Sequence, residues 1–155
     1  MRPTWQEKDL SKDAMFFKCV EIAKVVLTRE IIQTQDALSA EESVISIYKN
    51  TPDKRIIILD KAYPYEDTFN NFPEPLFVVY PRASSNAWKV EAIRENPKNF
   101  KNRKDLPKTW AGLRDEDLQK VTGVSDAIFC HRGLYLVVVK SKEGAIALAQ
   151  KALGE

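Results

Sequence analysis

The spacing of apolar residues predicts a long helical segment, then a series of strands, then a closing helix. Between Lys12 and Asn50, apolar side chains recur at steps of three and four residues, as on an amphipathic helix. Ser11 precedes this segment and suits its N-cap position. Ser39 followed by Glu42 has the spacing of a capping box. The segment is therefore either two helices, the second beginning near Ala40, or one bent helix.

Five shorter apolar runs follow, and we interpret each of them as a strand because turn residues bound it. These runs are Arg55–Asp60, Leu76–Tyr80, Trp88–Ile93, Ala127–Cys130 and Leu134–Val139. The second and third are separated by a short polar turn, which predicts a hairpin. Between and after the strands, the pattern indicates a loop or short helix over 64–71, a helix from Asp115 closed by Gly123, and a final helix over 143–153.

This order of elements predicts an α+β fold. We expect a mixed, mainly antiparallel five-stranded sheet, with long N-terminal helices and further helices packed on the sheet. The 155 residues, 44% of them hydrophobic, suit a single domain spanning 1–155. No apolar run reaches the roughly 18 residues of a membrane span, and the N-terminus lacks a signal-peptide pattern, so we expect no membrane partner and a cytoplasmic location. Cys19 and Cys130 lie in apolar surroundings, which predicts two buried thiols.

Candidate chemistry is sparse, because the chain has one histidine, His131. Catalytic triads and zinc clusters usually need more from this residue type, and no phosphate loop or dinucleotide fingerprint occurs. His131-Arg132-Gly133 separates two predicted strands, so an imidazole and a guanidinium would meet an anion at one end of the sheet. The alternative is a tight hairpin with a polar tip. Trp110 opens a segment that either anchors the loop before a helix or lines a cleft.

One stretch, Arg94–Lys108, gathers six basic residues against two acidic ones, with Phe100 inside it and Trp110 beside it. Basic residues with aromatic side chains nearby can follow a phosphate backbone and stack bases. The alternative is a solvated loop with one aromatic anchor in the core. The net charge of +2 does not by itself argue for nucleic acid.

The segment from Phe100 to His131 resembles the family of the melanocyte proliferating gene protein, metal-dependent hydrolases related to DHH phosphoesterases. The shared pattern is Phe100-x-x-Arg103-x-x-Leu106-Pro107-x-x-Trp110-x-Gly112-Leu113-Arg114-Asp115, then Leu118, Gly123 and Ile128-Phe129-x-His131. Outlying matches extend it over nearly the whole chain, at Pro3-x-Trp5, Leu59-Asp60, Pro64, Glu143-Gly144-Ala145 and Ala149. The resemblance is to the C-terminal half of such proteins.

The resemblance implies a role in hydrolysis of nucleic acid or nucleotides. Eukaryotic members are described as 3′-to-5′ RNA exonucleases, whose N-terminal half carries histidine and aspartate signatures for a divalent metal, expected to be manganese. This sequence has no such signature, so we expect no cofactor in this chain and no catalysis by it alone. By the same resemblance, it would close over a cleft and hold single-stranded RNA or another nucleotide substrate beside a separate catalytic domain or chain.

The candidate substrate-binding residues are basic or aromatic: His131, Arg114, Arg103, Trp110 and Arg132. His131, Arg114 and Arg103 match family motif positions, and the resemblance makes them candidates for phosphate contacts. One departure affects this expectation. After the histidine, the family's pattern runs through an aromatic residue and a glycine pair, whereas here the corresponding stretch ends in Val137-Val138. If those glycines let backbone approach a ligand, the valines weaken that function.

Two other functions stay open. The chain could be a protein-interaction or dimerisation module whose N-terminal helix, over 14–32, pairs with a partner or forms a homodimer through an exposed apolar patch. It could also be an independent hydrolase, against which the single histidine argues.

Overall fold

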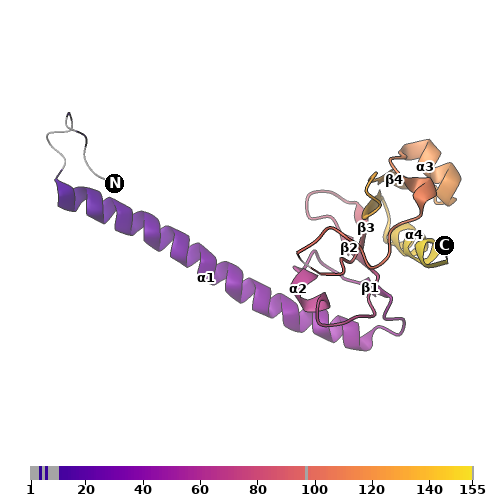
Figure 1. Ribbon diagram of the computed structural model, residues 1–155, viewed down its shortest axis with the longest axis horizontal. Helices are drawn as coiled ribbons and strands as arrows, with labels where there is room; N and C mark the ends of the chain where they lie inside the picture. The colour runs from indigo at the N-terminus through magenta and orange to yellow at the C-terminus, as the bar shows by residue number, and fades with distance from the viewer. Residues whose placement is uncertain (1–3, 5, 7–10, 97, 155) are drawn as a thin grey trace. The chain divides into compact units, whose positions relative to one another are not determined.

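The N-terminal part of the chain forms one helix. The computed structural model describes residues 4, 6, 11–96 and 98–154, which separate into two compact units, Met1–Ser39 and Ala40–Glu155. Helix α1 (Lys12–Asn50) begins in the first unit and ends in the second (Figure 1). The Ser11 hydroxyl oxygen accepts the Ala14 backbone N–H at 3.0 Å, which confirms the predicted N-cap. The Pro3-x-Trp5 match lies outside the described residues.

The expectation of two N-terminal helices is corrected by this structure. The Ser39–Glu42 pair does not start a new helix, because α1 runs through it without interruption. No glycine or proline occurs between residues 12 and 50, so nothing in the backbone ends the helix before Asn50. A capping-box pattern inside a run of good helix formers therefore gave a false signal.

The second unit is an α+β fold, as predicted, built on a mixed five-stranded sheet of order β1-β2-β3-β5-β4. Its strands are β1 (Ile56–Ile58), β2 (Phe77–Pro81), β3 (Trp88–Ala92), β4 (Ala127–Cys130) and β5 (Leu136–Val139). β1 pairs parallel with β2, and the other neighbours pair antiparallel. The predicted hairpin of β2 and β3 is confirmed.

Three helices of this unit match predicted segments: α2 (Glu66–Phe69), α3 (Asp115–Thr122) and α4 (Lys142–Gly154). Gly123 closes α3 in the left-handed conformation, at φ 66°, as predicted. A 3-10 turn at Lys108–Trp110 was not predicted. β5 begins two residues later than predicted, because Leu134 has φ 57° and belongs to the preceding turn.

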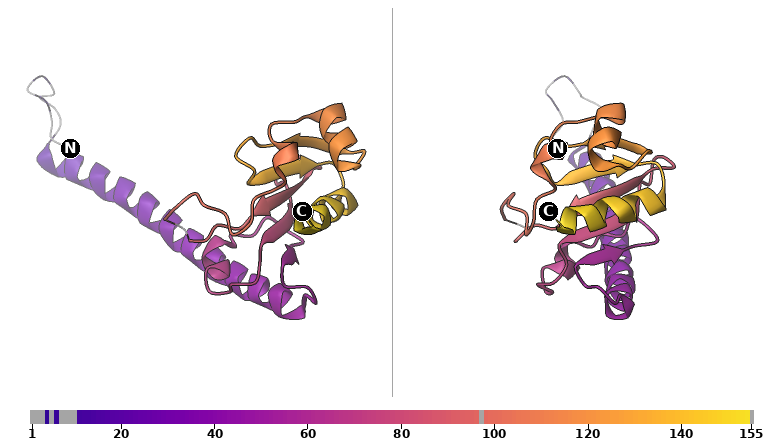
Figure 2. Two further views of the ribbon diagram at one scale, coloured as in Figure 1. Left: turned by 45° about the vertical axis from the view of Figure 1, so that its right-hand side comes forward. Right: turned by 90° about the vertical axis from the view of Figure 1, so that its right-hand side faces the viewer.

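Two hydrophobic clusters lie on opposite faces of the sheet. Helix α4 lies along one face (Figure 2), where Leu148 and Ala149 are fully buried together with Val79, Val90 and Val137. On the other face, Val44 and Tyr48 of α1 and Phe69 of α2 pack over β1 and β2. Among the described residues, none from β4 or β5 joins this second cluster. Within the second unit, none of the described helices contributes a cluster residue over the half of that face formed by β3, β5 and β4.

We call this uncovered half the open face. Side chains alternate between the two faces of each strand, so the residues opposite the α4 side belong to it. They are Lys89, Glu91, Phe129, His131, Leu136 and Val138. This surface mixes charged, aromatic and aliphatic side chains. We therefore take it as the candidate ligand-binding surface of the second unit.

The two cysteines differ. Cys130 is fully buried in the cluster under α4, and burial raises the pKa of its thiol to about 12, so it is unreactive at neutral pH. Cys19 is half-buried, so the prediction of two buried thiols holds for Cys130 alone. In the described part of the chain, no helix combines the length and apolar composition needed to cross a bilayer.

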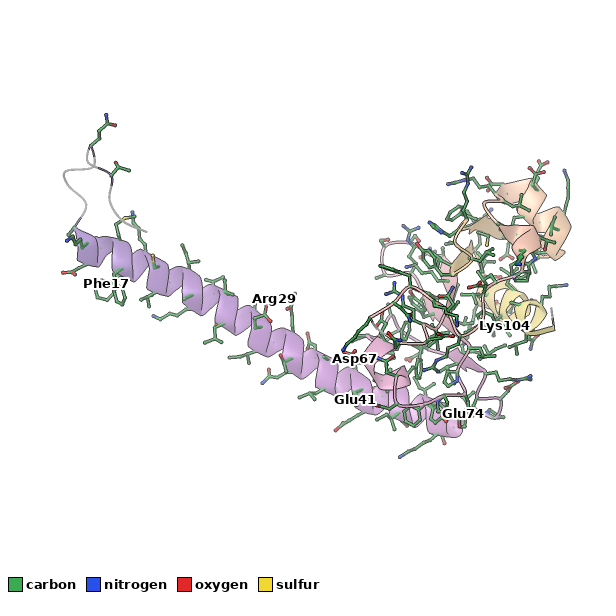
Figure 3. All side chains as sticks on the ribbon, in the orientation of Figure 1. Phe17, Arg29, Glu41, Asp67, Glu74 and Lys104 are labelled. Carbon is green, nitrogen blue, oxygen red and sulfur yellow. The ribbon has the colours of Figure 1, made fainter. Side chains whose placement is uncertain are left out.

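The first unit exposes much of its apolar surface. The large apolar side chains of α1 that are more than two-fifths exposed are Phe16, Phe17, Ile22, Val25, Val26, Leu27, Ile31, Ile32 and Leu38. Figure 3 shows the side chains of this part of α1, with Phe17 and Arg29 labelled, projecting outward from the helix. The three- and four-residue spacing of apolar side chains correctly predicted the helix. In this unit, however, these side chains are not buried.

Candidate nucleic-acid interface

Four planar side chains follow one another at the end of β4 and β5. The guanidinium carbon of Arg114 lies 4.4 Å from the Phe129 ring centroid. The Phe129 and His131 rings are 6.2 Å apart and nearly perpendicular, at 82°. The His131 and Tyr135 rings are 4.4 Å apart. We call Arg114, Phe129, His131 and Tyr135 the stacking row, because its contacts are cation–π and aromatic pairs.

The loop before α3 places Arg114 against the sheet. Arg114 is the extended N-cap residue of α3, and its backbone forms an isolated antiparallel bridge with Phe129. One step along, the Cys130 N–H donates to the Leu113 carbonyl at 3.0 Å. These bonds extend the ladder beyond β4, so the guanidinium of Arg114 is held over an aromatic ring.

Gly112 brings Arg132 into the same region. Gly112 has φ 74°, a conformation that suits glycine, and a Cβ there would lie 2.9 Å from Arg132 Cγ. The side chain of Arg132 thus passes against the backbone of the Gly112 loop. Since Arg132 follows His131 directly, this contact keeps a second guanidinium near the stacking row.

The turn after β4 fixes the His131 ring. Its Nδ1 accepts the Gly133 N–H at 2.9 Å, so in the neutral ring the proton lies on Nε2. Leu134, whose N–H donates to the His131 carbonyl at 2.9 Å, adopts φ 57°. A positive φ is costly for a residue with a side chain, and such strain is frequent at ligand-binding turns. His131 therefore presents an oriented N–H donor beside two aromatic rings.

The structure brings together three of the five predicted residues: His131, Arg114 and Arg132. Trp110 is 1% exposed and packs in the cluster under α4, so it anchors the loop. The sequence left open whether Trp110 anchors the loop before α3 or lines a cleft, and its burial shows that it anchors the loop.

Arg103 lies elsewhere and binds backbone. Its Nη1 donates to the carbonyls of Phe72 at 2.6 Å and Pro75 at 3.0 Å. Its Nη2 donates to Phe69 at 2.7 Å, and its Nε donates to Arg94 at 3.2 Å. Burial lowers the pKa of this guanidinium. Since four acceptors engage a group with five N–H donors, the geometry favours a structural role, and phosphate contact by Arg103 stays a prediction.

Sequence reasoning did not select Phe129, Tyr135 or Lys89. Phe129 occurs in the family pattern but was not chosen as a site residue. The signal available was the alternation along the predicted strands, which separates Phe129 from its buried neighbour Cys130. Lys89 Nζ lies 5.4 Å from the Tyr80 ring centroid on the same face. The stacking row and Lys89 together make this region cationic and aromatic.

A metal site is not formed by the described residues. No three histidine, cysteine, aspartate or glutamate side chains gather where they could hold an ion. Manganese in a separate catalytic domain or chain stays a prediction from the resemblance.

Comparison with known proteins identifies the family of this chain. A family model described as an uncharacterised protein family (UPF0160), and named for MYG1 exonuclease, matches residues 1–153. The chain is 25% identical to the MYG1 exonuclease of Homo sapiens over 171 residues, which cover 100% of the chain and 44% of that protein. It is 31% identical to a MYG1 protein of Saccharomyces cerevisiae over 166 residues, which cover 99% of the chain and 49% of that protein.

A MYG1 protein of Schizosaccharomyces pombe is 27% identical, over 97% of the chain and 49% of its own length. The chain thus spans about half the length, or less, of these relatives. No solved structure matches it.

Proposed function

Since this chain belongs to the MYG1 exonuclease family (UPF0160), we propose that it is a substrate-binding domain that holds single-stranded RNA for a nuclease-like protein. The proposal assigns bond cleavage to a separate catalytic domain or chain of the metal-dependent, DHH-related type, and no hydrolysis to this chain alone. Family membership supports a nuclease-like role, and the part played by this region is our inference.

The single observation that carries the proposal is the stacking row beside its cations. Aromatic rings offer π-faces to any base, and each stacked base contributes about 1–3 kcal/mol to single-strand binding. Phe129 and His131 are half-buried and Arg114 is exposed, so the row is accessible. Guanidinium groups bind phosphate through paired N–H donors, which Arg114 and Arg132 can supply.

The roles of the individual groups follow from this geometry. Phe129 and His131 would stack bases, and the His131 Nε2–H would donate to a phosphate or base oxygen. Arg114 and Arg132 would neutralise phosphate charge, so binding should weaken as salt rises. The strained turn at Leu134 keeps the imidazole fixed, which lowers the entropy lost on binding.

The test is fluorescence anisotropy of a 3′-labelled single-stranded RNA with the purified chain, with manganese present and over a series of salt concentrations. We expect a salt-sensitive rise that Arg114→Gln weakens. Lys120→Gln, which removes an exposed positive charge from α3, is the matched control and should bind normally. Absence of any rise contradicts RNA binding. A decrease over time, after exclusion of contaminating nuclease, contradicts the assignment of catalysis to a separate domain or chain.

A second candidate function rests on a different observation, the exposed apolar surface of α1 in the first unit. Its nine large apolar side chains are each between 41% and 70% exposed, so part of the ~800 Å² that each partner buries in a standard interface is available on this helix. An isolated helix of this composition gains little stability in water without a partner. We propose that this partner is a second copy of the chain, so that two molecules form a homodimer through α1.

A further inference from the structure

A pocket opens between α2 and β3 at the edge of the open face. It has a volume of about 130 Å³ and is lined by Tyr65, Glu66, Asn70, Glu91 and Arg94, together with Ala92 and Ile93. A cavity of about 150 Å³ can accept benzene. The pocket is therefore close in size to a single six-membered ring.

A buried tyrosine holds Glu91 in place. The Tyr80 hydroxyl donates to Glu91 Oε2 in a short hydrogen bond, and the Tyr65 ring packs edge-on against the Tyr80 ring, with the two centroids 5.6 Å apart. Burial raises the pKa of both phenols, so both keep their protons at neutral pH. Since Oε2 accepts from Tyr80, Oε1 is the acceptor that Glu91 can offer to a ligand.

The other polar groups differ in hydrogen-bonding character. Glu66 adds a second carboxylate, whereas the Asn70 amide and the Arg94 guanidinium can donate. Arg94 also lies 5.0 Å from the centroid of the Phe100 ring, and Phe100 is 87% exposed. Acceptors and donors thus line one small pocket, with an exposed aromatic ring beside it.

The pocket shares one face of the sheet with Arg114, Phe129 and His131 of the stacking row, whereas Tyr135 packs against the cluster under α4. Glu91 pairs directly with Leu136 across β3 and β5, and the His131 N–H donates to the Leu136 carbonyl at 2.8 Å. Residues paired in this way point to the same face. Two strand spacings separate Glu91 from His131, roughly 10 Å between their Cα atoms. A single strand lying on the row can therefore reach the pocket.

We propose that this pocket recognises one base of the bound strand and selects cytosine, a single ring with an exocyclic amine. This inference rests on the proposed function. A glutamate oxygen accepts from the cytosine N4 amine. The Asn70 or Arg94 donors would complete recognition at the carbonyl oxygen of the base. Uracil has a carbonyl oxygen in place of the amine, so it would face Glu91 with no proton between two acceptors.

The experiment compares cytosine-only and uracil-only RNAs of equal length by anisotropy, at one salt concentration, with the whole chain. We expect the cytosine RNA to bind about tenfold more tightly. Glu91→Gln keeps an oxygen for Tyr80 and presents an amide N–H₂ to the pocket, so the preference should disappear or reverse. Glu95→Gln removes the same charge outside the pocket, from an exposed ion pair with Lys101, and should leave the preference unchanged.

The outcomes separate the two proposals. Equal binding of both RNAs, unaffected by Glu91→Gln, overturns the cytosine pocket and leaves RNA binding standing. If neither RNA binds, the proposed function fails, and NMR titration with cytidine and uridine monophosphates then decides on the pocket. Shifts at the Ala92 and Ile93 amides with the cytidine nucleotide alone would support it. No shift with either nucleotide would overturn it. Unfolding midpoints of the variants confirm that they are folded.

Discussion

Arg114 and Phe129 contact each other twice, since their backbones form an antiparallel bridge and the Arg114 guanidinium carbon lies 4.4 Å from the Phe129 ring centroid. The loop before α3 and the edge strand β4 therefore present charge and aromatic surface as one unit. The two side chains should nevertheless contribute differently to RNA binding, because charge is screened by salt and stacking is not.

Arg114→Gln should reduce the slope of log affinity against log salt by about one, while Phe129→Leu should leave the slope unchanged. Phe129→Leu should instead weaken binding by about 1–3 kcal/mol at every salt concentration. Anisotropy titrations across a salt series measure both quantities. Equal slopes for wild type and Arg114→Gln would show that Arg114 makes no phosphate contact.

Arg103 should matter for stability more than for binding. Its guanidinium donates to four backbone carbonyls, three of which follow or end α2. Arg103→Ala leaves these acceptors without their donor and should cost about 2 kcal/mol in the free energy of unfolding, measured with urea. Arg103→Lys keeps the positive charge but lacks the planar guanidinium group with its paired N–H donors. It should therefore recover only part of the lost free energy of unfolding. A stable Arg103→Ala that has lost RNA binding would instead support the phosphate contact predicted from sequence.

Gly112 and Gly123 form a matched pair for testing the loop that carries Arg114. Both have positive φ, at 74° and 66°, so alanine at either position should cost about 1 kcal/mol of stability. At Gly123 the added methyl group meets only Lys151 Nζ, at 3.9 Å, whereas at Gly112 it meets Arg132 Cγ at 2.9 Å. Gly112→Ala should therefore lose more stability and also weaken RNA binding. Equal losses in urea unfolding, with normal binding, would argue against a role for the Arg132 contact.

Alkaline pH should destabilise the second unit through its buried phenols. Burial raises the pKa of Tyr65 and Tyr80, and Glu91 adds to the effect on both. The folded state keeps these protons and the unfolded state releases them above its pKa of about 10, so stability is complete below that pH and falls above it. Urea unfolding at increasing pH, with phenolate absorbance as a second signal, tests this. Titration of all five tyrosines near pH ~10 in a folded protein would contradict it.

Self-association through α1 is the test of the second candidate function. Ile22→Gln with Val26→Gln removes two exposed apolar side chains one helical turn apart without breaking the helix. Sedimentation should show a dimer for the wild type and a shift to monomer for the double variant. Lys24→Gln, an exposed polar change between them, should leave the dimer intact. A wild-type monomer at all concentrations would contradict pairing of two copies.

Much of the local structure was predictable because neighbouring residues determine it. The Ser11 cap, the Gly123 terminator and the hairpin of β2 and β3 each depend on a few consecutive residues, and each was predicted correctly. The capping-box pattern at Ser39 failed for the opposite reason. A local signal for a new helix was present, but no residue stopped the helix already in progress.

The candidate site was predictable only in part. A motif resemblance and one histidine directed attention to His131 and Arg114, but spacing could not show that Arg103 turns toward α2 or that Trp110 is buried.

By itself the sequence determined the order of helices and strands, the α+β class and the family, since these follow from periodicity, turn residues and motif. The tertiary structure alone decided that β5 lies between β3 and β4, which places Glu91, Leu136 and His131 in one row. The physical reason is that strand pairing and burial depend on residues far apart in the chain, whose meeting no local pattern encodes.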